Sequence, residues 1–168
     1  MDIPTPVHNE LHRIATTGII YRVNGEGARE YLITKRAPHK KVWPGKWTVP
    51  GGGLEVGDYI NEEATYQNSE SPQWYHVLER ALLREINEEV GVEVKDIELL
   101  QDVAFIRPDG VAVIVFSFYC AYVDGDVVLD EDATEHAWVT AEAAQTYDFI
   151  QGIEKEIMAT EERLTKKN

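Results

Sequence analysis

The stretch that decides the fold is Arg84-Glu85-Ile86-Asn87-Glu88-Glu89-Val90-Gly91-Val92. Apolar residues run up to it at intervals of three and four, which is typical of one buried face of a helix. That face is formed by Trp74, Val77, Leu78, Ala81, Leu82, Ile86 and Val90. Ser71 and Pro72 suit the N-cap and the first helical position, and Gly91 suits the residue after the last turn. We therefore expect a helix over residues 72–90.

The apolar face of this helix continues into carboxylates. Glu85 follows Ala81 and Leu82 by four and three residues, and Glu85, Glu88 and Glu89 share one side of the helix. Three like charges at this spacing repel one another and weaken an isolated helix. A solvated run of charges is the plain alternative, but these positions extend a face that is buried one turn earlier. A divalent cation would compensate the charges, and oxygen ligands favour magnesium or manganese over zinc.

The rest of the chain alternates short strands with few helices. Strand-like segments cover residues 14–23, 31–34, 47–49, 98–107, 111–123 and 136–140. A second amphipathic helix is expected over about residues 149–164. Strands interrupted by two helices, without regular βα alternation, favour an α+β domain. A length of 168 residues fits one domain, so we expect residues 1–168 to form a single unit.

The composition excludes several classes of protein. Lys and Arg number 16 against 30 Asp and Glu, which gives a formal net charge of −14. Such a protein does not bind nucleic acid or an anionic membrane by bulk attraction. The single Cys120 rules out an intrachain disulfide framework and a cysteine-rich zinc site. The N-terminus has no signal-like segment, and no apolar stretch reaches about 20 residues, so a cytoplasmic location is expected.

The charge is unevenly distributed along the chain. Residues 29–53 carry a net charge of +5, and residues 54–93 carry −8. The sign changes at the run Gly51-Gly52-Gly53. A solvated surface would explain this, since uneven charge is common. A site that needs cations and anions side by side, such as a metal–phosphate site, explains it more specifically.

Together with Gly52 and Asp58, residues 84–92 resemble the Nudix box, G-x5-E-x7-R-E-U-x-E-E-x-G-U, where U is a bulky aliphatic residue. The second half matches at every specified position, and residues 47–58 look like the strand-and-glycine entry to the box. Two departures stand out. Asp58 replaces a glutamate, and 25 residues separate it from Arg84 where the pattern has seven. The difference is an insertion of 18 residues inside the box, at about residues 59–76.

This resemblance implies the Nudix fold, an α/β/α sandwich with a mixed central sheet. It also implies Mg²⁺-dependent hydrolysis of a pyrophosphate bond in a nucleoside diphosphate linked to another moiety. The substrate would be a nucleoside triphosphate or a nucleotide sugar, a nucleoside monophosphate would be released, and Mn²⁺ could substitute for Mg²⁺. The partner would be this small nucleotide, with no nucleic acid and no membrane, and a homodimer stays open.

Residue roles follow from the same resemblance. The expected metal ligands are Glu85, Glu88, Glu89 and the carbonyl of Gly51, whose lack of a side chain allows close approach. Arg84 would orient its neighbouring carboxylates, supported by Asp58 or another acid such as Glu79. The expected substrate contacts are Arg36, Lys46 and Gly52, and the general-base candidates are Asp132 and Glu135 in the acidic loop 130–135.

Two other functions stay open. Residues 35–47 loosely resemble the Nudix-related isopentenyl diphosphate isomerases, but those use a cysteine near the site and Cys120 lies in an apolar strand. A non-catalytic nucleotide-binding domain would have kept the fold alone. Aromatic residues of the insertion, such as Tyr66 and Trp74, could stack on a base. A lid over the sheet or a dimer contact is the favoured interpretation for them.

Overall fold

The computed structural model describes residues 11–67 and 71–167. Most of the N-terminal stretch, in which no targeting signal is expected, lies outside these residues. The strands are β1 (Arg13–Val23), β2 (Arg29–Arg36), β3 (Trp47–Thr48), β4 (Gly51–Gly53), β5 (Tyr66–Gln67), β6 (Pro72–Gln73), β7 (Glu93–Ile106), β8 (Ala112–Asp124) and β9 (Ala133–Val139). The helices are α1 (Gly57–Ile60), α2 (Val77–Glu89), α3 (Ala141–Ala144) and α4 (Ile153–Lys167).

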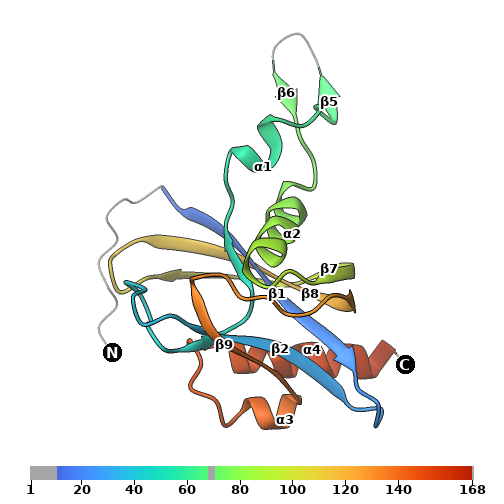
Figure 1. Cartoon of the computed structure of the whole chain (residues 1–168). Coiled ribbons are helices and arrows are strands. Elements are labelled where there is room, and N and C mark those ends of the chain that lie inside the picture. Colours follow the sequence, from blue (N-terminus) through green and yellow to red (C-terminus); the bar gives the residue numbers. More distant parts are fainter. Residues whose placement is uncertain (1–10, 68–70, 168) are drawn as a thin grey trace.

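A mixed sheet forms the centre of the described chain. Its strands follow the order β3-β2-β1-β8-β7, with β4 paired to β1 and β9 paired to β2 (Figure 1). Strands β1 and β8 run parallel over nine residue pairs, and their neighbours are antiparallel. Because β4 pairs with the first half of β1 and β2 with the second, the sheet splits beside β1. The split brings the glycine run next to Ala15–Thr17.

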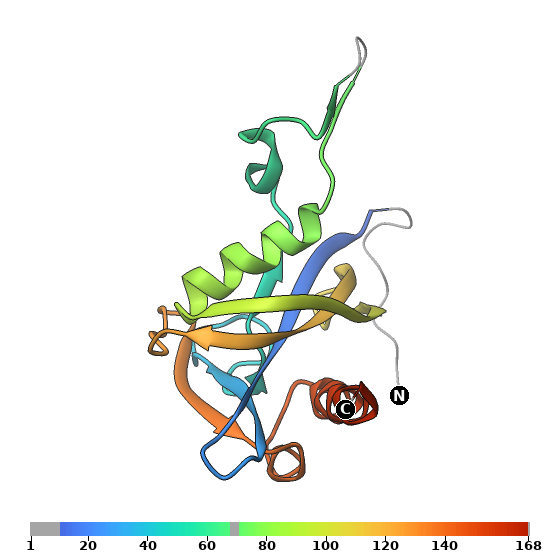
Figure 2. The same cartoon turned by 90° about the vertical axis from the view of Figure 1, so that its right-hand side faces the viewer.

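Helices cover both faces of this sheet. Neighbouring residues of one strand point to opposite faces: Ile19 and Tyr119 contribute to the core under α3 and α4, whereas Ile20 and Cys120 contribute to the core under α2. Figure 2 shows α2 and α4 on the two sides of the sheet. This is the expected α/β/α sandwich, and the two cores fix α2 and its carboxylates against the sheet.

The long helix of the box begins later than the sequence suggested. Leu82 and Ile86 are buried as expected, and each contributes about 1.5–3 kcal/mol through burial. The helix, however, starts at Val77 instead of residue 72. Pro72 and Gln73 pair with β5 instead, and His76 adopts the left-handed conformation with φ of 59°, which ends that extended segment. The expected N-cap at Ser71 is therefore wrong, while Gly91, with φ of 68°, follows the helix as predicted.

The insertion inside the box forms a projecting arm. We use this name for residues 61–67 and 71–76, which stand away from the sheet in both views (Figures 1 and 2). Contacts that hold the arm include the pairing of β5 with β6, the Tyr59 and Trp74 rings, which lie 5.5 Å apart, and the hydrogen bond that Trp74 Nε1 donates to the Glu62 carbonyl. The lid expected from its aromatic residues is not formed, because the arm points away from the body.

Most remaining expectations hold within a few residues. The six expected strand segments appear as β1, β2, β3, β7, β8 and β9. The last helix begins at Ile153, after Gly152, instead of residue 149. Short pieces such as α1, α3 and β4–β6 were not anticipated, since each depends on tertiary contacts more than on periodicity. No helix within the described ranges is long and apolar enough to cross a membrane.

Candidate functional site

An open cavity of about 1280 Å³ lies against the sheet beside the glycine run. Six of the residues expected at the site line it: Arg36, Gly51, Gly52, Glu85, Glu89 and Asp132. The strands β4, β1, β8 and β7 contribute successive parts of its lining, through residues such as Gly52, Ala15, Val115 and Val103. The fold thus brings the basic segment before the glycines and the acidic helix after them to one cavity.

Two carboxylates of α2 fit closely against the glycine run. The Gly51 N–H donates to Glu89 Oε2 at 2.8 Å. A Cβ atom on Gly52 would overlap the carboxylate of Glu85, so a larger residue there would displace this carboxylate from its position. Glu85 and Glu89 are one helical turn apart, which is why both reach the same edge of β4. The glycines and the carboxylates therefore form one structural unit, as the motif suggested.

Burial changes the acidity of both carboxylates. Desolvation raises the pKa of Glu89 to about 8, although the hydrogen bond from Gly51 opposes the change. Desolvation also raises the pKa of Glu85, against the opposing effect of Arg84. Burial thus favours the protonated form of Glu89 near neutral pH, and a nearby cation would favour its ionised form.

Arg84 connects the two halves of the interrupted box. Its Nε and Nη2 atoms donate to the two carboxylate oxygens of Asp58, and Nη2 also donates to the Gly53 carbonyl at 3.0 Å. The Asp58 side chain is 2% exposed, and the Arg84 hydrogen bonds hold its pKa below the usual value although burial opposes this. Asp58 thus supports the arginine across the insertion, which settles the choice between Asp58 and Glu79 in favour of Asp58.

Glu88 lies apart from the other two glutamates. Arg84 Nη1 donates to Glu88 Oε2 at 2.9 Å, and the Glu88 side chain is 53% exposed. Within the described residues, no group of three or more His, Cys, Asp or Glu side chains is gathered as a ready metal site. The three glutamates share a helix face as predicted, but Arg84 draws Glu88 to one side of it.

The basic side of the cavity matches the expectation in part. Arg36 is half-buried, and its Nε donates to the Val42 carbonyl at 3.2 Å. Lys46 pairs with Asp148 and is not among the residues that line the cavity. Lys40 and Arg13 do line it, and neither was singled out from the sequence. Lys40 belongs to the basic block, which was a usable signal, whereas Arg13 is brought in only by the pairing of β1 with β4.

The two general-base candidates differ in position. Asp132 lines the cavity and pairs with Lys40 and His39, and the Lys40 hydrogen bond lowers its pKa. Glu135 pairs with Lys35 on the sheet and is not among the lining residues. A paired carboxylate with a lowered pKa is a weak base at neutral pH. Of the two candidates, Asp132 is the one that a ligand in the cavity can reach, because Glu135 lies outside the cavity.

The donor set suits a hard divalent cation. Carboxylate oxygens of Glu85 and Glu89 converge beside the backbone of Gly51 and Gly52 at the edge of the cavity. Oxygen ligands of this kind are those that Mg²⁺ and Mn²⁺ prefer in proteins. The residues present therefore fit the metal that the sequence motif implied.

Comparison with known proteins identifies the family. The model of the NUDIX domain matches residues 72–160, which is more than half of the chain and includes the whole second half of the box. The chain belongs to the Nudix family. The match begins downstream of Gly52 and Asp58, so the first half of the box lies outside it. The prediction of a Nudix pyrophosphohydrolase is confirmed at the level of family and enzyme class.

Relatives in sequence and in structure agree with this Nudix assignment. The nucleoside triphosphatase NudI of Salmonella paratyphi B is 28% identical over 129 residues, which cover 71% of this chain and 79% of NudI. The MutT protein of Methanosarcina mazei has a TM-score of 0.65 at 23% identity and covers 97% of this chain and 99% of its own. The NUDIX domain of Shewanella oneidensis NrtR, solved with ADP-ribose, has a TM-score of 0.71 at 16% identity, over 93% and 90% of the two chains. The expected α+β Nudix fold is confirmed.

Proposed function

We propose that this Nudix protein hydrolyses a pyrophosphate bond of a nucleoside triphosphate in a Mg²⁺-dependent reaction and releases a nucleoside monophosphate. The observation that carries the proposal is the packing of Glu85 and Glu89 against Gly52 and Gly51 at the edge of a cavity that also holds Arg36. The similarity to NudI, which is named a nucleoside triphosphatase, favours this substrate over nucleotide sugars.

Each residue has a distinct role in this proposal. Glu85 and Glu89 would hold the cation, with Glu88 joining them after it leaves Arg84, and the Gly51 carbonyl would complete the ligand set. When bound, Mg²⁺ supplies charge neutralisation at the phosphates and lowers the pKa of an attacking water. Arg36 would bind phosphate oxygens, and Gly52 leaves the space that the Glu85 carboxylate occupies beside them. Asp132 would accept a proton from water only after it separates from Lys40, whose hydrogen bond lowers its pKa, and Glu135 lies outside the cavity.

Arg84 acts as a positioning residue. Its guanidinium group is fixed by Asp58 and the Gly53 carbonyl, and it contacts Glu85 and Glu88 at 3.0 and 2.9 Å. Two charged contacts to one anchored cation restrict both carboxylates. Arg84 would therefore keep Glu85 oriented toward the glycine run while Glu88 changes partners.

The isomerase alternative requires a reactive cysteine near the site, and Cys120 does not meet this requirement. Cys120 is fully buried in the core under α2, burial raises the pKa of its thiol to about 12, and it is not among the residues that line the cavity. A thiol in this state is not a proton donor or nucleophile. A non-catalytic nucleotide-binding domain stays as the second candidate, to be separated by experiment.

The test is a panel of nucleoside triphosphates and nucleotide sugars with Mg²⁺, with both products identified by mass spectrometry. We expect a nucleoside monophosphate and pyrophosphate from a triphosphate. Glu85→Gln should lower the rate by more than about 100-fold, because the loss of even a second-shell metal partner costs about 10–100-fold. Glu79→Gln, on the same helix but outside the cavity, is the matched control. Tight nucleotide binding without any product would instead support the non-catalytic domain.

A further inference from the structure

The cavity has a second end that the proposed chemistry does not use. Strands β4, β1, β8 and β7 are consecutive neighbours, so β7 lies three strand spacings, about 14 Å, from the glycine run. At this end the floor is apolar, with Val115 and Val113 from β8 beside Val103 from β7. A ligand whose phosphates lie at Glu85 and Glu89 would extend its remaining part over these valines.

Trp43 covers this end of the cavity. The residue belongs to the loop between β2 and β3, and its ring lies 6.0 Å from the ring of Phe105 at an angle of 54°. Both rings line the cavity. Trp43 has a φ of 53°, which costs a residue with a side chain about 1–2 kcal/mol. Such a conformation persists only where surrounding contacts impose it, and it is most common at functional sites.

The contacts that impose it are on the same loop. Arg36 Nε donates to the Val42 carbonyl at 3.2 Å, and the Gly45 N–H donates to the Arg36 carbonyl at 3.1 Å. The Ala37 N–H donates to the Asp132 carbonyl at 2.8 Å, which ties the start of the loop to the segment before the neighbouring strand β9. Trp43 is thus held in place by the residue proposed to bind phosphate.

A polar group stands at the edge of the apolar floor. Gln101 of β7 is exposed and lines the cavity, and its Nε2 donates to Glu156 Oε1 at 3.2 Å. Ser117 donates to the same oxygen at 3.0 Å. Glu156 is 7% exposed, and its Oε2 has no hydrogen-bond partner within the described part of the chain. Glu156 thus holds the Gln101 amide at the edge of the floor, and its unpaired Oε2 is a buried polar atom beside the cavity.

We propose that this end of the cavity is a nucleobase subsite, in which Trp43 stacks on the base and Gln101 hydrogen-bonds to its edge. The proposal rests on the proposed function, which places the phosphates at the other end. An aromatic wall, an apolar floor and one oriented amide suit a planar heterocycle that carries both donors and acceptors. A sugar in this position would leave its hydroxyl groups facing valine side chains.

Calorimetry without metal tests the subsite independently of catalysis. The ligands are AMP, GMP, CMP and UMP, with ribose 5-phosphate as the base-free probe. Trp43→Ala should weaken nucleotide binding by about 5- to 100-fold and leave ribose 5-phosphate unchanged, since one base–aromatic stack accounts for about that factor. Trp43→Phe should retain most of the affinity, and Trp74→Ala in the arm, outside the cavity, is the matched control.

Three results would overturn the proposal: no binding of any of the four nucleotides to the wild type, unchanged nucleotide binding by Trp43→Ala, or equal weakening of ribose 5-phosphate. If Trp43→Ala does not fold, Gln101→Leu is the second variant. It should also weaken the binding of the nucleotides and leave the binding of ribose 5-phosphate unchanged. If triphosphates are hydrolysed, both variants should raise KM with little change in kcat, whereas Glu85→Gln lowers kcat. Failure of all hydrolysis would refute the proposed function and leave the binding result standing.

Discussion

Single residues explain how the interrupted motif still forms its site. Asp58 and Arg84 are 26 positions apart, yet their side chains form a partly buried ion pair, and Gly52 leaves the space that the Glu85 carboxylate occupies. The aspartate is one methylene shorter than the glutamate of the usual pattern. Helix α1 compensates by carrying Asp58 to the arginine, so a change of residue type leaves the contact in place.

The buried carboxyl group of Glu156 predicts how the stability of the folded state depends on pH. Burial raises its pKa above the usual 4.5, although Ser117 and Gln101 donate hydrogen bonds to it. The folded state therefore favours the neutral acid. The stabilisation is complete below about pH 4.5 and is lost as the pH rises through the raised folded pKa. Since Glu156→Gln resembles the neutral acid, we expect this variant to gain stability over the wild type as the pH increases.

The measurement is the free energy of urea unfolding between pH 4 and 8. Glu162→Gln on the same helix is the control, because its side chain is 69% exposed. The free energy of unfolding of the wild type and of Glu162→Gln should fall as the pH rises. That of Glu156→Gln should fall less. Parallel curves for all three proteins would contradict the prediction.

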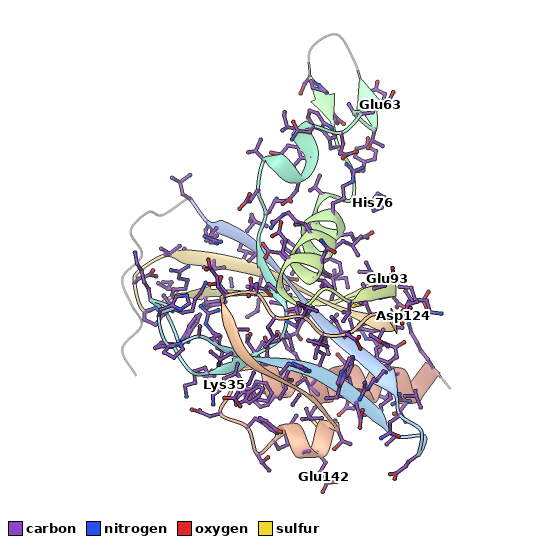
Figure 3. All side chains as sticks on the ribbon, viewed as in Figure 1. Lys35, Glu63, His76, Glu93, Asp124 and Glu142 are labelled. Atoms are coloured by element: carbon purple, nitrogen blue, oxygen red, sulfur yellow. The ribbon has the colours of Figure 1, made fainter. Side chains whose placement is uncertain are left out.

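At the scale of elements, the arm is separate from the site. Figure 3 shows Glu63 on the arm and His76 where the arm joins α2, both away from the sheet that carries Lys35. No described residue of the arm lines the cavity. Its large exposed side chains include Tyr66 and Tyr75, at 53% and 49% exposure. The arm is therefore an addition to the box that leaves the geometry of the box unchanged.

Deleting the arm should accordingly preserve the enzyme. We expect replacement of residues 62–74 by a short Gly-Ser linker to cost about 0.5–1.5 kcal/mol, because the Tyr59–Trp74 ring contact is lost. Hydrolysis should be unchanged. Asp58→Asn is the contrasting variant: it should cost about 1–3 kcal/mol and lower activity, since Arg84 loses the most buried of its three charged partners. Activity assays and urea unfolding measure both, and an inactive deletion would show that the arm contributes to the site.

At the scale of the whole molecule, the net charge of −14 becomes a local property. Basic residues such as Arg36 and Lys40 face the cavity opposite the acidic end of α2. Figure 3 shows other acids, such as Glu93, Asp124 and Glu142, spread over the outer surface. The overall excess disfavours nonspecific attraction of polyanions, while the cavity offers a small anion basic side chains.

The carboxylates at the acidic end of α2 predict how a divalent metal affects the stability of the folded state. One cation bound to Glu85 and Glu89, at a concentration 100 times its Kd, stabilises the folded state by about 2.7 kcal/mol. For a chain of this size that raises Tm by roughly 5–11 °C. A Glu85→Gln, Glu89→Gln double variant should lack this increase. Differential scanning calorimetry with MgCl₂, compared with NaCl at equal ionic strength, separates binding from screening. An equal increase in the double variant would place the metal elsewhere.

The sequence by itself determined the family, the helix that carries the glutamates of the box and most of the strands. These features are local: helical spacing places Glu85 and Glu89 one turn apart, and alternating burial marks both faces of β1 and β8. It also located the glycines, because only glycine allows carboxylates to approach the backbone so closely. The late start of α2 was missed, since Pro72 and Gln73 prefer a partner strand that appears only once the arm has folded.

Tertiary structure alone decided the shape of the site. Pairing of β4 with β1 brought Arg13 to the cavity, and ion pairs diverted Lys46 and Glu135 from it. The contact between Trp43 and Phe105 joins residues 62 positions apart, on strands and loops that meet only in the folded sheet. Spacing along the chain cannot encode such contacts, because they depend on the order in which the strands lie side by side.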